Sequence, residues 1–426
     1  MRTGNLGKNK FISLKVKLKE LRIYSLSRST CFQKRKSKKI SALNLIISFY
    51  NCNLNGTFSL SGWAFQLSQL ISKPVSKQAI FERVDDSFIE LCRELLQKSF
   101  GEKIKARKLL SKFRNVYIQD STCVLLPSAL YDCYKGNGSR TGNHSVAKIQ
   151  VIYNLMKSTF EELKITSFTR NDQAAAFDIL QYVKPGDLIV RDLGYFVLNS
   201  LVEIMNIGAH FICPLRKDTK LFDPQNNKPI ELIKVLKKKR FLKMKVLLGA
   251  EHKIAVTLFA VKLDDKTTRY RQRCAAKNRD LRRKINDEKL QLLSWDIFVS
   301  SCEELETQTI QDIYKIRWHI EILFKSWKSH LKLEKSIPKK LERRFIPEAI
   351  MYLTLLLSIL FIMPIYRWAL KISSEVSLIK ITRFLASAMP KSDWNLSLHQ
   401  LLDLRPLILY ESRNRANFIN KLSLLT

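Results

Sequence analysis

The sequence predicts an α/β fold in which a sheet-based core is interrupted by a β-rich insertion and preceded by a helical region. Between residues 111 and 216, short apolar runs rich in β-branched residues alternate with helical stretches, which is typical of helices packed on a sheet. Residues 217–300 add further strand-like runs, and residues 40–110 follow a helical period. A chain of 426 residues can bury the substantial core that such a fold needs.

Basic residues dominate the charge of the chain. Lysine and arginine number 74 against 38 acidic residues, which gives a net charge of +36. Such an excess favours nucleic acid as the partner, with a ribosome-associated or a basic membrane-surface protein as alternatives. The eight cysteines include no Cys-x2-Cys pair, and no secretory signal precedes them, so we expect reduced thiols in a cytoplasmic protein.

The N-terminal part divides into two regions. Residues 1–39 hold thirteen Lys and Arg and one acid, Glu20, and predict a flexible basic arm on DNA backbone. The alternative is translated upstream sequence that lies outside the functional protein. Residues 40–110 predict short helices, one of them starting near Ser76, compatible with a helical DNA-binding domain. Any small helical bundle would show the same pattern.

The first part of the core, residues 111–216, begins with a β-rich run that contains an acid. Asp120 interrupts the run 116–126. A charge inside a buried strand costs free energy unless a partner compensates it, and ligation of a metal ion would provide that compensation. The ordinary alternative is a turn at a strand end. The glycine-rich residues 136–142 then predict a long hairpin leading to a strand at 147–155, with Arg140 as a phosphate contact.

A second acid lies at the end of a later strand. After a strand at 160–169 and a helix at 172–180, the apolar run that starts at Gly186 delivers Asp192 at its C-terminal end, where open α/β sheets place their ligands. Asp187 is the competing carboxylate, but it precedes the strand and suits a turn. A helix at 197–205 and a strand at 210–216 are expected to complete the sheet.

The residues between this strand and the C-terminal half of the core predict an insertion. It spans residues 217–300, with strands at 241–248, 252–261 and 295–300 and a basic helix at 269–289. Trp295 opens the last strand. We expect it to stack on a base swung out of the duplex, with Trp318 as a second candidate for this role. The alternative is that Trp295 packs the insertion against the core.

The second part of the core, residues 301–370, contains a helix with an unusual stripe. Tyr314, Arg317, Glu321, Lys325 and Lys328 fall within about a quarter of a turn, with Trp318 beside them. Apolar residues occupy the opposite side, so this helix can pack by one face and work with the other. One acid among several cations suits a site that cleaves a polyanion, because the acid can bind a metal ion and the cations can bind phosphates. A solvated face of mixed charge is the alternative.

These residues carry a family resemblance. Tyr314, Arg317, Glu321 and Lys328 reproduce the Y-x2-R-x3-E-x6-K signature and resemble the DDE transposases of the insertion-sequence-four family. The resemblance covers roughly residues 55 to 370 and implies an RNase H-like catalytic core whose third acid is Glu321. Asp120 and Asp192 then match the family's first and second acids, since Asp192 is followed by the family's D-x-G-Y pattern.

The resemblance implies a DNA transposase with a two-metal mechanism. Asp120, Asp192 and Glu321 would hold two Mg²⁺ ions, with Mn²⁺ as a substitute, for cleavage and strand transfer. The expected partners are double-stranded DNA, as terminal inverted repeats and target, and a second copy of the chain in a dimer. A nucleoid-associated cytoplasmic location follows. The rival classes are a nuclease of the same fold without strand transfer and a non-catalytic DNA-binding derivative.

One apolar run raises the question of a membrane. Residues 349–365 come close to the length of a spanning helix, but Lys and Arg flank them and Pro364 stands near their end. We expect a core helix beneath the sheet and no membrane partner. Residues 371–426 predict a helical C-terminal tail.

Overall fold

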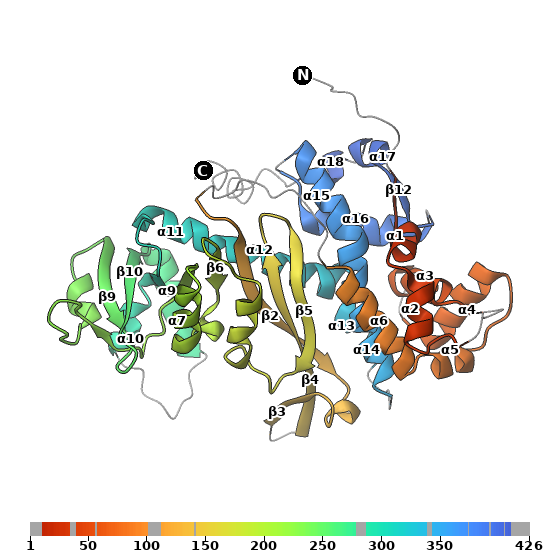
Figure 1. The fold of residues 1–426 in the computed structure, drawn as a ribbon, viewed down its shortest axis with the longest axis horizontal. Coiled ribbons are helices and arrows are strands. Elements are labelled where there is room, and N and C mark those ends of the chain that lie inside the picture. The colour runs from red at the N-terminus through yellow and green to blue at the C-terminus, as the bar shows by residue number, and fades with distance from the viewer. Residues whose placement is uncertain are drawn as a thin grey trace.

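The computed structural model describes residues 11–34, 40–55, 58–100, 112–139, 142–277, 287–338, 343–373, 375–391, 393–403 and 405–409. Its centre is a ten-stranded mixed sheet with the order β3-β4-β2-β6-β7-β11-β10-β9-β8, and β5 pairs with β4 (Figure 1). The strands are β2 (Val116–Leu126), β3 (Lys135–Ser139), β4 (Gly142–Asn154), β5 (Thr159–Ser167), β6 (Leu188–Arg191), β7 (His210–Pro214), β8 (Leu221–Phe222), β9 (Phe241–Leu248), β10 (Ile254–Lys262) and β11 (Trp295–Ser300).

The predicted strands are present, but the insertion does not stand apart from the core. β2, β6 and β7 run parallel, β4 lies antiparallel to β2, and β11 pairs antiparallel with β7. The insertion's strands therefore extend the core's own sheet, and the prediction that the strand at 210–216 completes the sheet is wrong. Pairing with β11 satisfies backbone groups that β7 would otherwise leave open at an edge.

Both faces of the sheet are covered, which explains the near-continuous apolar runs of its parallel strands. Along β6, Leu188 and Val190 enter one core and Ile189 enters the core on the opposite face. The second core contains α7 (Leu198–Asn206) and α8 (Leu232–Leu236). The predicted helix at 172–180 is a 3-10 helix, Ala174–Gln181.

The first core is built around the helix that raised the membrane question. α14 (Phe345–Leu357) continues through a π-helical turn (Ser358–Ile362) into α15 (Met363–Ile372). The helix is apolar and long enough to span a membrane, but 94% of its apolar window is buried inside the protein. The prediction of a core helix is therefore confirmed.

The N-terminal segment corrects the prediction of a flexible arm. Residues 11–34 form β1 (Phe11–Ser13), α1 (Leu14–Glu20) and α2 (Ile23–Ser29), and β1 pairs with β12 (Asn395–Ser397) near the other end of the chain. Leu14, Leu18, Ile23 and Leu26 are buried in the first core. Their helical spacing anchors the segment while its cations remain on the outer side. Residues 1–10 and 35–39 lie outside the described part.

Of the helical region predicted for residues 40–110, the described residues 40–55 and 58–100 form a layer of helices at one end of the molecule (Figure 1). It contains α3 (Ala42–Asn55), α4 (Leu60–Ile71), α5 (Lys77–Arg83) and α6 (Asp86–Lys98). Ser76 caps α5 by accepting a hydrogen bond from the Ala79 amide at 3.1 Å, as the sequence predicted for a helix start there. The Tyr50 hydroxyl donates to the Leu353 carbonyl at 3.0 Å and ties α3 to α14.

The C-terminal residues are helical where they are described, but they are not a separate tail. They form α16 (Leu378–Ala388), α17 (Leu398–Asp403) and α18 (Arg405–Ile408). The buried indole of Trp394 donates to the side chain of Asn51 at 2.8 Å. The C-terminal helices are therefore part of the same body as the N-terminal ones.

Candidate active site

Two aspartates lie side by side because of the sheet register. Gln119 of β2 pairs with Arg191 of β6 in a parallel ladder, so the next residues, Asp120 and Asp192, are neighbours. Adjacent strands lie about 4.8 Å apart. Asp192 follows the last residue of β6, whereas Asp120 sits within β2 and is much more buried, with side-chain exposures of 14% for Asp120 and 43% for Asp192.

The third acid comes from the helical stretch across this edge. α11 (Thr307–Tyr314), a 3-10 turn (Lys315–Arg317), α12 (Trp318–Lys325) and a π-helical turn (Ser326–His330) follow one another directly. The predicted packing face is confirmed, since its seven apolar residues are buried: Ile313, Ile316, Ile320, Leu323, Phe324, Trp327 and Leu331. Glu321 lies on α12 with a half-exposed side chain.

Arg317 brings the three acids together. Its Nη1 lies 3.0 Å from Asp120, its Nη2 lies 2.6 Å from Glu321, and its Nε lies 3.8 Å from Asp192. The Tyr314 hydroxyl donates to Asp192 at 3.3 Å, and the Tyr314 ring faces the guanidinium. Acids from three separate stretches of sequence thus surround one cation.

The electrostatics of the site favour a cation among the acids. Burial raises the pKa of Asp120 to about 6, even though Arg317 acts in the opposite direction. Burial lowers the pKa of Arg317, but Tyr314 and the three carboxylates outweigh it and hold that pKa above its usual value. An ionised Asp120 therefore depends on a nearby positive charge.

The donor set fits Mg²⁺ in kind. Three carboxylates supply the hard oxygen ligands that this ion prefers. In the described part of the chain no cluster of three acidic, histidine or cysteine side chains is close enough to hold a metal as it stands. The Arg317 guanidinium lies between Asp120, Asp192 and Glu321.

The competing carboxylate has a structural role. Asp187 is fully buried and accepts two hydrogen bonds from the Arg114 guanidinium at 3.0 Å, one from Asn115 at 3.0 Å and one from the Lys184 amide at 2.8 Å. Its lone pairs are occupied at the start of β6, away from the three acids. This geometry favours Asp192 over Asp187.

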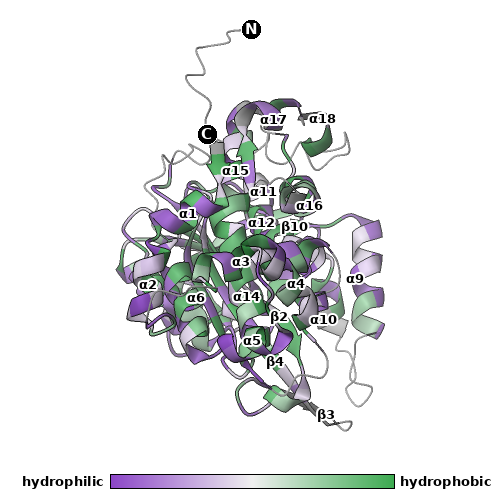
Figure 2. Cartoon of the chain, turned by 90° about the vertical axis from the view of Figure 1, so that its right-hand side faces the viewer, coloured by the Kyte–Doolittle hydropathy of each residue, from purple (hydrophilic) through white to green (hydrophobic). Residues whose placement is uncertain are grey.

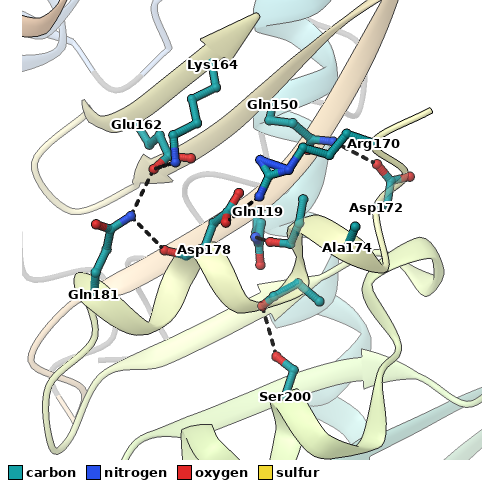
Figure 3. A network of polar contacts seen from close by, with 12 residues as sticks. Gln119, Gln150, Glu162, Lys164, Arg170, Asp172, Ala174, Asp178, Gln181 and Ser200 are labelled. Carbon is teal, nitrogen blue, oxygen red and sulfur yellow. Dashed lines mark hydrogen bonds and ion pairs between the residues drawn. The ribbon is translucent and has the colours of Figure 1, made fainter. Parts of the chain in front are cut away.

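A fourth acid, Asp172, lies beside β2 and the turn that follows β6. Asp172 accepts hydrogen bonds from Ser121 at 2.7 Å and Lys148 at 2.9 Å. The Gln150 side chain lies 3.5 Å from the same carboxylate, as Figure 3 shows. A Cβ on Gly194 would lie 2.8 Å from Asp172, so the turn after Asp192 packs directly on this carboxylate. Asn171, next to Asp172, accepts a hydrogen bond from the Ala174 amide at 2.9 Å at the start of the 3-10 helix.

The cations and aromatics predicted to contact DNA differ in how exposed their side chains are. Trp318 and Lys325 are exposed on α12. Lys328 is engaged within the protein, where it donates to the Cys123 carbonyl at 2.6 Å and pairs with Glu334 at 2.9 Å. Trp295 is half-buried against the second core. Arg140 lies outside the described residues.

A cavity of about 1110 Å³ adjoins the acids. Its lining includes Trp295 from β11 and Arg271 from α9 (Asp265–Lys277). It also includes Tyr314, Arg317 and Trp318 from the helical stretch 307–330. Both tryptophans proposed to stack on a base therefore face the same space. The remaining described helices are α10 (Asp287–Leu292) and α13 (Leu333–Ser336).

Comparison with known proteins identifies the family. A profile of the transposase DDE domain matches residues 111–357, which is more than half of the chain and includes all three acids. The chain belongs to this transposase family. It is 25% identical over 331 residues to the transposase for insertion sequence element IS231B of Bacillus thuringiensis subsp. berliner, covering 71% of the chain and 69% of that relative.

Two further proteins resemble the chain. The transposase for insertion sequence element IS1151 of Clostridium perfringens is 24% identical over 352 residues, covering 75% of the chain and 73% of that relative. A structure of a piggyBac transposase synaptic complex with hairpin DNA aligns at a TM-score of 0.47 and 10% identity, covering 95% of the chain and 81% of that structure's chain.

Proposed function

We propose that this chain is the transposase of an insertion sequence, which binds the element's terminal inverted repeats, cleaves phosphodiesters and joins the 3′-hydroxyl ends to target DNA. One observation carries the proposal. Asp120, Asp192 and Glu321 converge around a single cation inside the region that matches the transposase DDE domain. Two acids on neighbouring parallel strands and a third on a packed helix support an RNase H-like core.

The three carboxylates would hold two Mg²⁺ ions, or Mn²⁺ in their place, which supply charge stabilisation to the attacking and leaving oxygens. The protein's own residues do the positioning. Arg317 turns from the acids to a DNA phosphate, so that one movement opens the ligand set and clamps the substrate. Tyr314 keeps Asp192 oriented through its hydroxyl.

Further residues would hold the DNA. Lys325 and Trp318 are exposed beside Glu321 and suit phosphate and base contacts, and Lys328 joins them if it leaves Glu334. The helices α3 to α6 would bind the element end, and a dimer of chains would bring two ends together. The net charge of +36 supports a long DNA path on each chain.

The test replaces each acid by its amide: Asp120→Asn, Asp192→Asn and Glu321→Gln. We expect each variant to lose cleavage of a duplex carrying the repeat by at least about 100-fold in Mg²⁺, with binding of that duplex largely retained. Asp218→Asn, at an exposed acid of the insertion, is the matched control. A triad variant that cuts near the parent rate would remove that acid from the site.

Two rival functions are tested with the same protein. A nuclease of this fold would release ends in Mg²⁺ but never join them to an added target duplex. A non-catalytic derivative would bind the repeat and leave it intact in both Mg²⁺ and Mn²⁺. Joined products in the parent, lost in Glu321→Gln, support the transposase.

A further inference from the structure

Helix α9 stands on the surface of the insertion without a packing face of its own. It spans Asp265–Lys277, and none of its side chains is buried. Figure 2 shows it at the side of the molecule, apart from the main body. Most helices in folded proteins gain stability from an apolar face. A helix that lacks one has to be held by polar contacts, and its surface is available for a partner.

The exposed residues of α9 form one basic stripe. Lys266, Arg269, Tyr270, Arg273 and Lys277 are all exposed, and at about 100° per residue they fall within roughly a third of a turn. The stripe contains no acid. Within the described part of the chain, no ion pair neutralises any of its four cations. Over about 16 Å of helix, four positive charges therefore face solvent.

The opposite side of α9 is linked through Asp296 of β11 to the helical stretch 307–330. Arg271 donates to Asp296 at 2.8 Å, and the other oxygen of Asp296 accepts from Gln311 of α11 at 2.8 Å. Asp264 caps the helix through the backbone and hydroxyl of Thr267 at 2.8 and 2.6 Å. The stripe is therefore held in a set direction relative to Tyr314 and Arg317, at the far side of the shared cavity.

A rigid row of cations without acids fits a row of phosphates. Duplex DNA presents one phosphate per about 3.4 Å along each strand, so a helix of this length can reach several of them. An acidic protein partner would be matched better by a surface with an apolar centre, and Tyr270 alone does not provide one. Duplex DNA is the partner that this surface favours.

The position of α9 in the molecule determines which part of a bound DNA it can contact. In Figure 1, α9 lies with the insertion at one end of the molecule, and α3 to α6 lie at the other, with β2 and β6 between them. DNA running from those helices across the acids would reach α9 after the cleaved bond. We propose that α9 grips the backbone of the flanking duplex, outside the element, an inference that rests on the proposed function.

The test uses the full chain with the substitutions Lys266→Gln, Arg269→Gln, Arg273→Gln and Lys277→Gln combined. Glutamine retains helix propensity and removes four charges, so the fold should survive, which the melting temperature checks. The control removes four charges elsewhere on the insertion, at the exposed Lys234, Lys237, Lys238 and Lys239. Binding is measured against salt in Ca²⁺, on one duplex with the repeat and its flank and on another that stops at the element end.

We expect the slope of log affinity against log salt to fall by about 3.6 units for the α9 variant on the flanked duplex, from four contacts at about 0.9 each. On the duplex without a flank, the α9 variant should match the parent, and the control should match the parent on both. An equal loss on both duplexes would place α9 on the element end and overturn the inference. A decrease in the salt slope on the flanked duplex that is no greater than the decrease for the control variant would also overturn the inference. Failure of the proposed function would appear differently, as a parent protein that binds the flanked duplex but never cleaves it.

Discussion

Arg317 contacts all three acids, and this makes it the residue whose removal is most informative. With Arg317→Ala, the carboxylates lose their shared cation. Because Asp192 and Glu321 are partly exposed, the cost in free energy of unfolding should be about 1–3 kcal/mol, less than for a fully buried pair. Mg²⁺ should then raise the melting temperature of the variant more than that of the parent. Equal responses, with Arg317→Lys as control, would show that Arg317 does not compete with the metal.

Asp172 offers a second test at the level of single residues. Its partner Lys148 is almost fully buried, so Asp172→Ala should lower the free energy of unfolding by about 3 kcal/mol by leaving that charge unpaired. Adding Lys148→Met should restore most of the loss. Urea unfolding measures both, and no recovery in the double variant would mean that the pair does not carry the effect.

The same acid predicts a dependence on pH. Burial acts to raise the pKa of Asp172, but hydrogen bonds from Lys148 and Ser121 outweigh it and hold that pKa below the ordinary aspartate value of 3.8. Its contribution to stability is therefore present above pH 3.8 and lost as pH falls through the lower folded pKa. Asp172→Asn should lose less stability than the parent on acidification through this range.

At the scale of the elements, Trp295 on β11 and Trp318 on α12 can each either stack on a DNA base or pack within the protein. Trp295 is half-buried against the second core, whereas Trp318 is 52% exposed beside the cavity. We expect Trp295→Ala to lower the melting temperature more than Trp318→Ala does. If either ring stacks on a swung-out base, an abasic nucleotide near the cleavage site should partly rescue the matching variant. A variant with no rescue and a large thermal loss would assign that ring to packing alone.

The elements also show what the sequence can and cannot predict. Apolar runs rich in strand-forming residues located β2 and β9 to β11, and the 3.6-residue spacing located the packed face of α12. The pairing of β11 with β7 could not be predicted, because nothing local encodes a contact between strands more than 80 residues apart. In α1 the density of lysines concealed the apolar positions Leu14 and Leu18, which are 0% exposed.

The candidate site divides in the same way. Asp120, Asp192 and Glu321 could be proposed from their strands, their helix and the family signature. The convergence on Arg317 and the support from Asp172 depend on the tertiary fold, since they join residues that lie 197 and 51 positions apart. Two buried polar residues on one face of β4, Lys148 and Gln150, were the available sign of a polar network.

For the whole molecule, the long apolar helix decides how the protein behaves in solution. Since α14 and α15 are buried among the N- and C-terminal helices, the protein should partition into the aqueous phase of a detergent phase separation. Leu353→Asp, at a position of 0% exposure, should unfold this core and drive the chain into aggregates. Recovery of the parent protein in the detergent phase would contradict the core assignment.

Asp120, Asp192 and Glu321, distant in the sequence, are proposed to form one metal site. Fe²⁺ bound in place of Mg²⁺, with ascorbate and peroxide, cuts a polypeptide next to the ion, and the cut positions can be read by mass spectrometry. If the three acids share one site, cuts should appear near residues 120, 192 and 321 together, be suppressed by excess Mg²⁺ and be absent in Glu321→Gln. Cuts clustered elsewhere, or cuts at these positions that persist in the variant, would contradict it.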